Sequence, residues 1–238
     1  MTKIAVVTGA GSGIGAAAAA ALATDGWTVV LAGRRRTRLE ELAATYPDLS
    51  LDPVPTDVTN EESVRNLFHV TTARHGRLDL LVNNAGMGGP PRDLDEIPLE
   101  EWNRVMEVNV ASMFLTSRAV VPVMREQGGG KIVNISSGTP FRGVPFLLHY
   151  VTSKGAIVAL TRALAKELGK DSIHVNCVAP GFTMSDGVKS HPEVVEKLRD
   201  VSVAARTIQR DQVPEDVVGA VVFLCSPAAD FVTGQTMV

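Results

Sequence analysis

Short apolar runs alternate with longer stretches of helical periodicity along this chain. The first run, from Lys3 to Thr8, leads into a glycine-rich loop and an alanine-rich stretch that predicts a helix over 16–23. Further runs predict strands at 28–32, 51–55, 78–82, 131–135 and 174–178, and helical patterns occupy 37–44, 61–74, 99–126 and 150–168. The alternation predicts an α/β fold with a doubly wound parallel sheet flanked by helices on both faces.

Length and composition agree with one such unit. A chain of 238 residues can bury a sizeable core, and no Gly-, Ser- or Pro-rich stretch divides it, so we expect a single domain over residues 1–238. The net charge of -3 gives no electrostatic reason for binding nucleic acid or an anionic membrane. No long apolar run or leader segment is present, and Cys177 and Cys225 read as buried thiols, so the expected location is cytoplasmic.

The loop after the first strand has the composition of a phosphate-binding turn. It reads Thr8-Gly9-Ala10-Gly11-Ser12-Gly13-Ile14-Gly15. Glycines let the backbone approach a diphosphate, and the following helix offers free N–H groups and a positive dipole end. The spacing differs from the common dinucleotide fingerprint, which would require a glycine at Ile14. A turn that binds nothing is the alternative, but its place in the first strand–helix unit favours a nucleotide.

A tyrosine and a lysine four residues apart carry the candidate chemistry. Tyr150 and Lys154 lie on one face of an expected helix, and Ser137 precedes the tyrosine by thirteen residues. A phenol titrates near pH ~10 and is a poor acid–base catalyst alone. A neighbouring ammonium favours the phenolate, so we expect Lys154 to lower the pKa of Tyr150 toward the working pH.

These features occur in a fixed order with several others. After the glycine-rich loop come Asn83-Asn84-Ala85-Gly86, Asn109, Ser137, Tyr150-x-x-x-Lys154 and Pro180-Gly181. In this order and spacing the chain resembles the short-chain dehydrogenase/reductase family from Ile4 to about Gln235. The resemblance implies a Rossmann-like fold and an NAD(P)-dependent oxidoreductase that interconverts a carbonyl and a secondary alcohol. In that family the last strand continues beyond the point where this chain ends, so its C-terminal end is expected to be truncated relative to the family.

The resemblance also implies roles for four residues. Tyr150 donates a proton in reduction and accepts one in oxidation, while Lys154 lowers its pKa and holds the nicotinamide ribose. Ser137 hydrogen-bonds the substrate oxygen, which gains charge as hydride moves. Asn109 lies within a long helix and is expected to hold a water that links Lys154 to solvent.

The cofactor is expected to lie along the carboxyl ends of the strands. By resemblance Asp57, followed by Val58, meets the adenine, although a role in capping the helix that opens near Asn60 is an alternative. Backbone groups after the fourth and sixth strands are expected to contact the nicotinamide ribose and carboxamide. The expected cofactor residues are Gly9, Ser12, Gly13, Ile14, Gly15, Arg34, Arg35, Asp57, Val58, Asn84, Ala85, Gly86, Tyr150, Lys154, Pro180, Gly181, Phe182 and Thr183.

The end of the second strand bears on the choice between NADP and NAD. An acidic residue there would bind the adenosine ribose and repel a 2′-phosphate, but the strand ends in Gly33 and Arg34. The guanidinium fork suits a phosphate, so the sequence predicts NADP, with NAD as the alternative. Arg36 and Arg38 are expected only to open a solvated helix.

Three variable segments, 87–91, 139–148 and 182–203, are expected to form the substrate pocket. They are mostly apolar, with Arg142 and Lys189 as polar handles, and predict an apolar or ring-bearing small-molecule substrate. One alternative is a 3-oxoacyl-[acyl-carrier-protein] reductase. Another is a nucleotide-binding redox sensor without turnover, although such proteins usually lack the tyrosine or the lysine.

Neither a metal nor a free monomer is expected. The histidines show no ligand spacing, and His149 beside Tyr150 reads as a pocket-wall or surface residue because it points about 100° away on a helix. The other four are His69, His75, His174 and His191. The stretches 99–126 and 150–168 are apolar on more than one side, and the family is commonly tetrameric, so we expect a homo-oligomer, a tetramer or a dimer.

Overall fold

The computed structural model describes residues 2–190 and 192–238, and its core is one parallel sheet of seven strands. The strands are β1 (Ile4–Thr8), β2 (Thr28–Gly33), β3 (Leu51–Pro55), β4 (Leu80–Asn83), β5 (Gly130–Ile135), β6 (Ile173–Val178) and β7 (Thr236–Met237). Their order across the sheet is β3-β2-β1-β4-β5-β6-β7, and every pair is parallel. The expected doubly wound sheet is confirmed, including the six strands located by their apolar runs.

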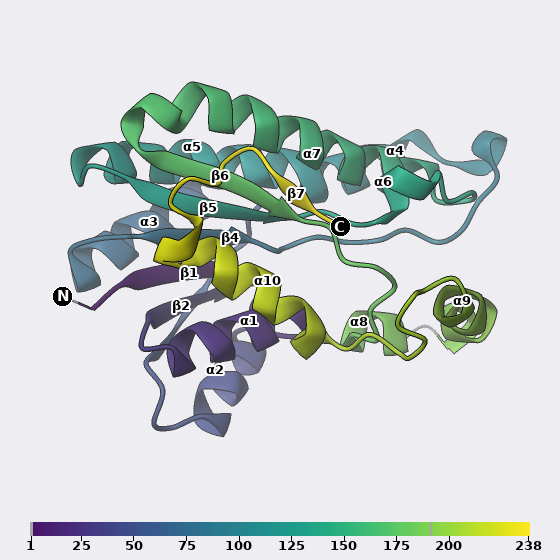
Figure 1. The fold of residues 1–238 in the computed structure, drawn as a ribbon, viewed down its shortest axis with the longest axis horizontal. Coiled ribbons are helices and arrows are strands. Elements are labelled where there is room, and N and C mark those ends of the chain that lie inside the picture. The colour runs from purple at the N-terminus through teal and green to yellow at the C-terminus, as the bar shows by residue number, and fades with distance from the viewer. Residues whose placement is uncertain (1, 191) are drawn as a thin grey trace.

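Helices cover both faces of the sheet (Figure 1). The longer ones are α1 (Gly13–Thr24), α2 (Arg36–Thr45), α3 (Glu61–His75), α4 (Leu99–Met106), α5 (Ser112–Glu126), α7 (Leu148–Leu168), α9 (Pro192–Ala204) and α10 (Pro214–Cys225). Short helices are α6 (Thr139–Arg142) and α8 (Asp186–Lys189), with 3₁₀ turns at Leu94–Glu96, Gly169–Asp171 and Pro227–Ala229. Buried side chains of α1, α2 and α10 pack on one face, and those of α3, α5 and α7 on the other.

The stretch 99–126 is helical, as expected, but it is not one regular α-helix. A π-helical segment, Glu107–Ala111, separates α4 from α5, and Asn109 lies buried inside it. Such an extra residue in a helical turn is frequent at functional sites. The helices α8, α9 and α10 follow the last predicted strand and were not located by their periodicity.

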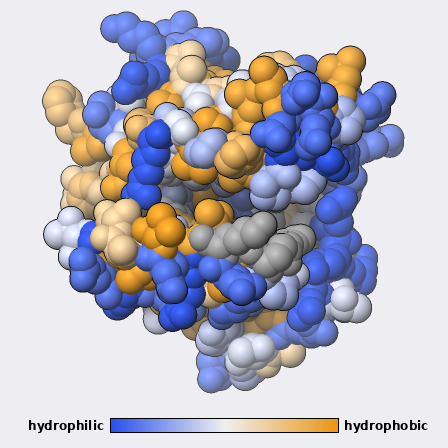
Figure 2. Space-filling model, turned by 90° about the vertical axis from the view of Figure 1, so that its right-hand side faces the viewer, coloured by the Kyte–Doolittle hydropathy of each residue, from blue (hydrophilic) through white to orange (hydrophobic). Residues whose placement is uncertain are grey.

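The carboxyl ends of the strands meet at one edge of the sheet, on the right of Figure 1. The loops there connect to α4, α6, α8 and α9, so the segments expected to line the substrate pocket gather at this edge. Figure 2 looks onto this side and shows a surface hollowed at its centre, with hydrophobic side chains bordering the hollow. Ligands of open α/β sheets bind at this edge.

Candidate active site

The glycine-rich loop forms a cradle at the N-terminus of α1. Gly9 and Gly13 have φ angles of 66° and 55°, which favour glycine. A Cβ on Gly15 would overlap the carbonyl of Gly9 and the side chain of Asn84. The N-cap Ser12 makes no side-chain hydrogen bond to the helix, and no acidic residue stands in its first turn. The start of α1 therefore offers a positive dipole end beside the glycine-rich loop, which fits a diphosphate, although the Gly13 N–H also lies 3.4 Å from Asp186 Oδ2.

Two asparagines, at the end of β4 and directly after it, tie neighbouring strands together. The Asn84 amide donates to the carbonyls of Thr8 and Gly9, at 3.0 and 3.3 Å. The Asn83 amide donates to Asn134 Oδ1 of β5 at 3.0 Å. The backbone N–H groups of Asn84 and Ala85 both donate to Thr8 Oγ1 at 3.0 Å. These bonds hold the edge of the cradle in place. The Ala85 N–H already donates to Thr8 inside the protein.

Arg34 and Arg35 stand exposed at the end of β2, next to the cradle. Arg35 Nη2 lies 3.5 Å from Ser12 Oγ in the glycine-rich loop. Among the described residues, no carboxylate lies within ion-pair distance of either guanidinium. The next two arginines form ion pairs inside α2, Arg36–Glu40 and Arg38–Glu41.

Asp57 shapes its own turn after β3. Its Oδ1 accepts hydrogen bonds from the N–H and the hydroxyl of Thr59, at 3.0 and 2.8 Å. The Thr59 N–H is the main cause that holds the pKa of Asp57 below its ordinary value, and the charges of Arg34 and Arg104 act in the same direction. The cap of α3 is Asn60, whose side chain accepts from the N–H of Ser63, so the capping alternative for Asp57 is wrong. Val58, next in sequence, is buried.

Ser137, Tyr150 and Lys154 come together where β5 ends and α7 begins. The Ser137 side chain is close enough to the Tyr150 phenol to act on its pKa as a hydrogen-bonding group, and Lys154 Nζ lies 5.7 Å from the centroid of the phenol ring. The neighbouring Ser136 is turned away and donates to the backbone carbonyl of Lys154 at 2.7 Å. Ser137, rather than Ser136, is therefore the serine beside Tyr150, as the resemblance implied, and its role toward a substrate stays a prediction.

The expected lowering of the tyrosine pKa is wrong for this arrangement. Burial raises the pKa of Tyr150, and the hydrogen bond with Ser137 acts in the opposite direction. The ammonium of Lys154 donates to the Ile135 carbonyl at 3.0 Å instead of to the phenol. Burial also lowers the pKa of Lys154 to about 8, with a smaller opposing effect from Cys177. Loss of hydration is the largest cause of both pKa shifts, because Lys154 is buried and Tyr150 is partly buried.

Asn109 clamps the loop that follows β4. Its Oδ1 accepts from the Met87 N–H at 2.7 Å, and its Nδ2 donates to the Met87 carbonyl at 2.8 Å and to Ser153 Oγ at 2.9 Å. Ser153 in turn donates to the Tyr150 carbonyl at 2.7 Å. Both N–H groups of the amide are therefore in use, and the expected role of Asn109 in holding a water stays a prediction.

The turn after β6 is held by residues far along the chain. Thr183 Oγ1 donates to Gln212 Oε1 at 3.0 Å and to the Gly181 carbonyl at 3.1 Å. The carbonyl of Phe182 accepts from the guanidinium of Arg206, and that of Pro180 accepts from the N–H of Gly138 at 2.8 Å. Sequence reasoning missed Gln212 and Arg206, because neither belongs to a motif.

The segment beyond this turn reaches the glycine-rich loop. Asp186, at the start of α8, places Oδ2 3.4 Å from the N–H of Gly13. A Cβ on Gly13 would approach the side chain of Ser185 to 3.1 Å. No local pattern marks the contact with Asp186, since 173 positions separate the two residues.

The histidines are dispersed over the described residues. His75 pairs with Asp52 at 3.1 Å near the opposite end of the sheet, and His191 lies outside the described residues. No group of three His, Cys, Asp or Glu side chains within the described ranges could hold a metal ion. His149 is fully buried, not a surface residue.

In residues 2–190 and 192–238, no helix combines the length and hydropathy needed to cross a bilayer.

The fold and this site define a Rossmann-type oxidoreductase that uses a nicotinamide cofactor. A family model described as "Enoyl-(Acyl carrier protein) reductase" matches residues 9–238. Nearly the whole chain, 99%, aligns with curated relatives at 34 to 37% identity. They are 3alpha-hydroxysteroid dehydrogenase of Mediterraneibacter gnavus (37%, 94% of its length), 7alpha-hydroxysteroid dehydrogenase of Escherichia coli (36%, 91%) and 3-oxoacyl-[acyl-carrier-protein] reductase FabG of Thermotoga maritima (34%, 95%). The chain belongs to the short-chain dehydrogenase/reductase family.

Solved structures agree with this assignment. The chain is similar to 3-ketoacyl-(acyl-carrier-protein) reductase from Brucella melitensis complexed with NADH, with a TM-score of 0.92 and 31% identity over 99% of this chain and 95% of that one. It is similar to actinorhodin polyketide ketoreductase with NADPH, with a TM-score of 0.93 and 31% identity over the same shares. The expected class, an NAD(P)-dependent oxidoreductase acting on CH–OH and C=O groups, is confirmed at the level of the family.

Proposed function

We propose that this protein is an NADP(H)-dependent enzyme that catalyses the reduction of apolar or ring-bearing ketones and the oxidation of the matching secondary alcohols. Tyr150 acts as general acid in the first direction and as general base in the second. The single observation that carries the proposal is the Ser137 side chain beside the Tyr150 phenol, whose pKa it acts to lower, with Lys154 Nζ 5.7 Å from the ring centroid. Two hydroxyl groups thus lie near each other, where a substrate oxygen can accept from both. When bound, the nicotinamide supplies or accepts the hydride.

The residues of the chain would bind, orient and protonate. The α1 N-terminus and Gly9, Ser12, Gly13, Ile14 and Gly15 hold the diphosphate, while Asp57 and Val58 border the adenine. Asn84, Ala85 and Gly86 border the ribose, and Pro180, Gly181, Phe182 and Thr183 the carboxamide. Lys154 has two parts in this proposal: it binds the ribose hydroxyls and supplies positive charge near Tyr150. Gly86 lies close to the ammonium, since an added Cβ would lie 3.4 Å from Lys154 Nζ and 3.2 Å from Asn109 Oδ1.

Apolar side chains at the rim support the substrate class. Met87, Phe141, Phe146 and Leu148 are all exposed, although they are large and hydrophobic. They come from two of the segments expected to line the pocket, and exposed apolar groups around a hollow favour an apolar ligand. Two relatives are named for ring-bearing alcohols, the hydroxysteroids, so ketosteroids are the first substrates to test.

A panel of carbonyl compounds tests the proposal. Oxidation of NADPH would be followed with ketosteroids, smaller cyclic ketones, diketones and a 3-oxoacyl thioester. We expect the highest kcat/KM for a ring-bearing ketone. Preference for the thioester would instead assign the alternative acyl reductase, the activity for which the relative from Thermotoga maritima is named. Tight NADPH binding without turnover of any compound would contradict the proposal.

Substitutions of Arg34 and Arg35 test the proposed preference for NADP over NAD. We expect Arg34→Ala and Arg35→Ala each to raise the KM for NADPH about tenfold, because each removes one charged contact to the 2′-phosphate, and to leave the KM for NADH unchanged. Arg36→Ala is the matched control, since Arg36 pairs with Glu40 inside α2 and should affect neither cofactor. A wild-type preference for NADH in kcat/KM would refute the assignment.

We also propose that the chain is one domain and acts as a homo-oligomer, a dimer or a tetramer, in the cytoplasm. Exposed Phe114 on α5, together with Phe223, Phe231 and Val238 near the C-terminal strand, supports association through apolar surface. The two buried, unpaired thiols Cys177 and Cys225 fit a reducing compartment. Light scattering of the purified protein would give the number of subunits.

A further inference from the structure

A buried histidine next to the proposed catalytic tyrosine takes no part in the chemistry above. His149 occupies the first turn of α7 and is fully buried. Neither of its ring nitrogens has a partner in hydrogen-bond geometry within the described part of the chain. A buried polar group without such a partner costs stability and is rare in native proteins. The contact with the Glu101 carboxylate is a polar interaction that the structure does give this imidazole.

The ring faces a carboxylate that is shared with an arginine. His149 Nε2 lies 3.0 Å from Glu101 Oε1 of α4, which packs against α7. Glu101 Oε2 accepts from Arg92 Nε at 3.0 Å, and Oε1 lies 3.3 Å from the same nitrogen. The Glu101 side chain is only 20% exposed, so solvent screens these contacts less than it screens surface pairs. We refer to these three residues as the Arg92–Glu101–His149 cluster.

The same histidine also shapes the loop that follows β4. An added Cβ on Gly89 would overlap His149 Nε2 and approach two carbons of the ring to 2.9 Å. The imidazole therefore lies against the backbone of this loop, and only glycine leaves room for it. Gly89 does not have a positive φ angle, so close approach, rather than backbone conformation, requires the glycine.

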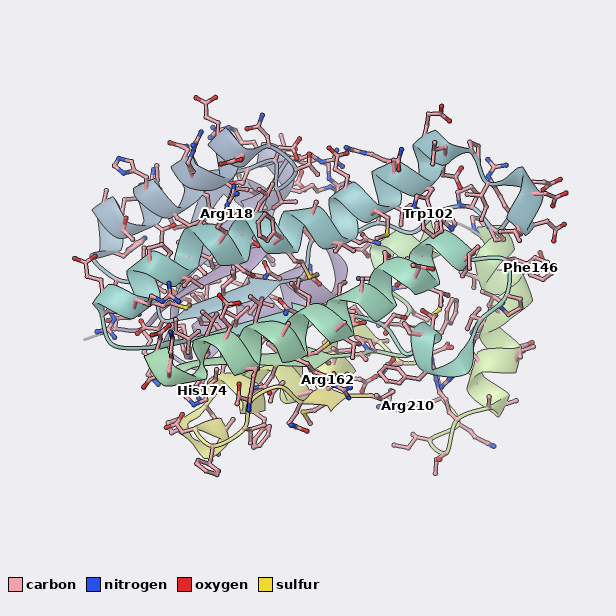
Figure 3. The ribbon with its side chains drawn as sticks, turned by 90° about the horizontal axis from the view of Figure 1, so that it is seen from above. Trp102, Arg118, Phe146, Arg162, His174 and Arg210 are labelled. Carbon is pink, nitrogen blue, oxygen red and sulfur yellow. The ribbon has the colours of Figure 1, made fainter. Side chains whose placement is uncertain are left out.

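The cluster connects two walls of the expected substrate pocket. Arg92 directly follows the first wall, residues 87–91, which begins at Met87 where Asn109 clamps the chain. The Arg92 backbone N–H donates to the carbonyl of Phe146, in the second wall, at 2.9 Å. Figure 3 shows Phe146 in the loop that leads into α7, at the same end of the molecule as Trp102, the neighbour of Glu101 on α4. Both walls are thus attached to the helix that carries Tyr150.

We propose that His149 is a positioning residue which, through Glu101 and Arg92, sets the distance between the two apolar walls and the Tyr150 hydroxyl. It would thereby determine how well the large apolar part of a ketone fits, without contacting the reacting atoms. This inference rests on the proposed function for its effect on catalysis. Its effect on the loop is independent of that function.

A double-mutant cycle between Gly89 and His149 tests the inference. We expect His149→Ala to raise the KM for the best ketone of the panel at least ~tenfold, with kcat and the KM for NADPH changed less than about threefold. Gly89→Ala alone should give a similar rise, because the added methyl group displaces the ring. Adding Gly89→Ala to His149→Ala should cost nothing further, since the ring is already gone. Glu101→Gln should raise the ketone KM as His149→Ala does. Glu100→Gln is the matched control, because Glu100 is the neighbouring residue and is exposed.

Hydrogen exchange provides a readout that does not depend on activity. In His149→Ala, the amides of Met87 and Arg92, which donate to Asn109 and to the Phe146 carbonyl, should exchange at least ~tenfold faster, while those of β5 and β6 stay unchanged. Unchanged exchange at Met87 and Arg92 would overturn the inference whatever the enzyme does. In an enzyme that reduces ketones, an unchanged ketone KM, or equal losses in kcat and in NADPH binding, would overturn it and leave the proposed function intact. An inactive wild type would contradict the proposed function alone.

Discussion

Tyr150→Phe is expected to reduce turnover by at least ~10²-fold while cofactor binding is largely kept. The substitution removes one oxygen and retains the ring, so the packing around α7 should not change. The lost hydroxyl is the proposed proton donor and the partner of Ser137. Because burial raises the pKa of Tyr150, the phenol is protonated at neutral pH and can supply the proton that ketone reduction requires. The measurements are kcat with the best ketone and a titration of NADPH binding.

The chain contains a matched control for this experiment. Its second tyrosine, Tyr46, is 41% exposed just after α2, and Tyr46→Phe should leave turnover unchanged. If Tyr150→Phe kept turnover within about threefold of the wild type, the general-acid assignment would be wrong. A parallel loss of NADPH binding would instead point to a structural defect at the cofactor site.

Local sequence patterns predicted the parts of the site that follow from helix and strand periodicity. Tyr150 and Lys154 share a helix face because 3.6 residues make a turn, and the glycine-rich loop follows from the first apolar run. Parallel strands then carried Ser137 and the Pro180 turn to the same edge without any long-range information. The fold class could therefore be predicted from short patterns, whereas the pairing of Ser137 with Tyr150 was implied by the family resemblance.

Tertiary contacts decided what the patterns could not. The pKa of Tyr150 depends on how deeply α7 is buried, and the helical spacing alone suggested the opposite direction. The contact between His149 and Glu101 joins two helices that are far apart along the chain. Gln212 reaches Thr183 from 29 positions away. No periodic signal marks such pairs, since they arise only when separate loops converge on the sheet edge.

Because Lys154 is buried, we expect its replacement to lower activity without lowering the stability of the fold. Lys154→Met is expected to lower turnover at least ~10²-fold, because the ammonium beside Tyr150 and the proposed ribose contact are both lost. The same change should not destabilise the fold below pH 8. Desolvation lowers the pKa of this lysine from 10.5 to about 8, so the folded protein bears a cost for the charged form. Methionine fills similar space without that cost.

The pH dependence of stability follows from the sign of this shift. A lysine with a lowered pKa in the folded state destabilises the fold fully below pH 8, and the penalty is relieved between about 8 and 10.5 as the group loses its proton. The gain for Lys154→Met at pH 7 should be on the order of 2 kcal/mol, since loss of the hydrogen bond to Ile135 offsets part of the relief. Melting temperatures at pH 7 and pH 10 would measure it, with exposed Lys166→Met on the same helix as the control. A lower melting temperature than wild type at pH 7, or full turnover in Lys154→Met, would show that the buried ammonium does not serve catalysis at the expense of stability.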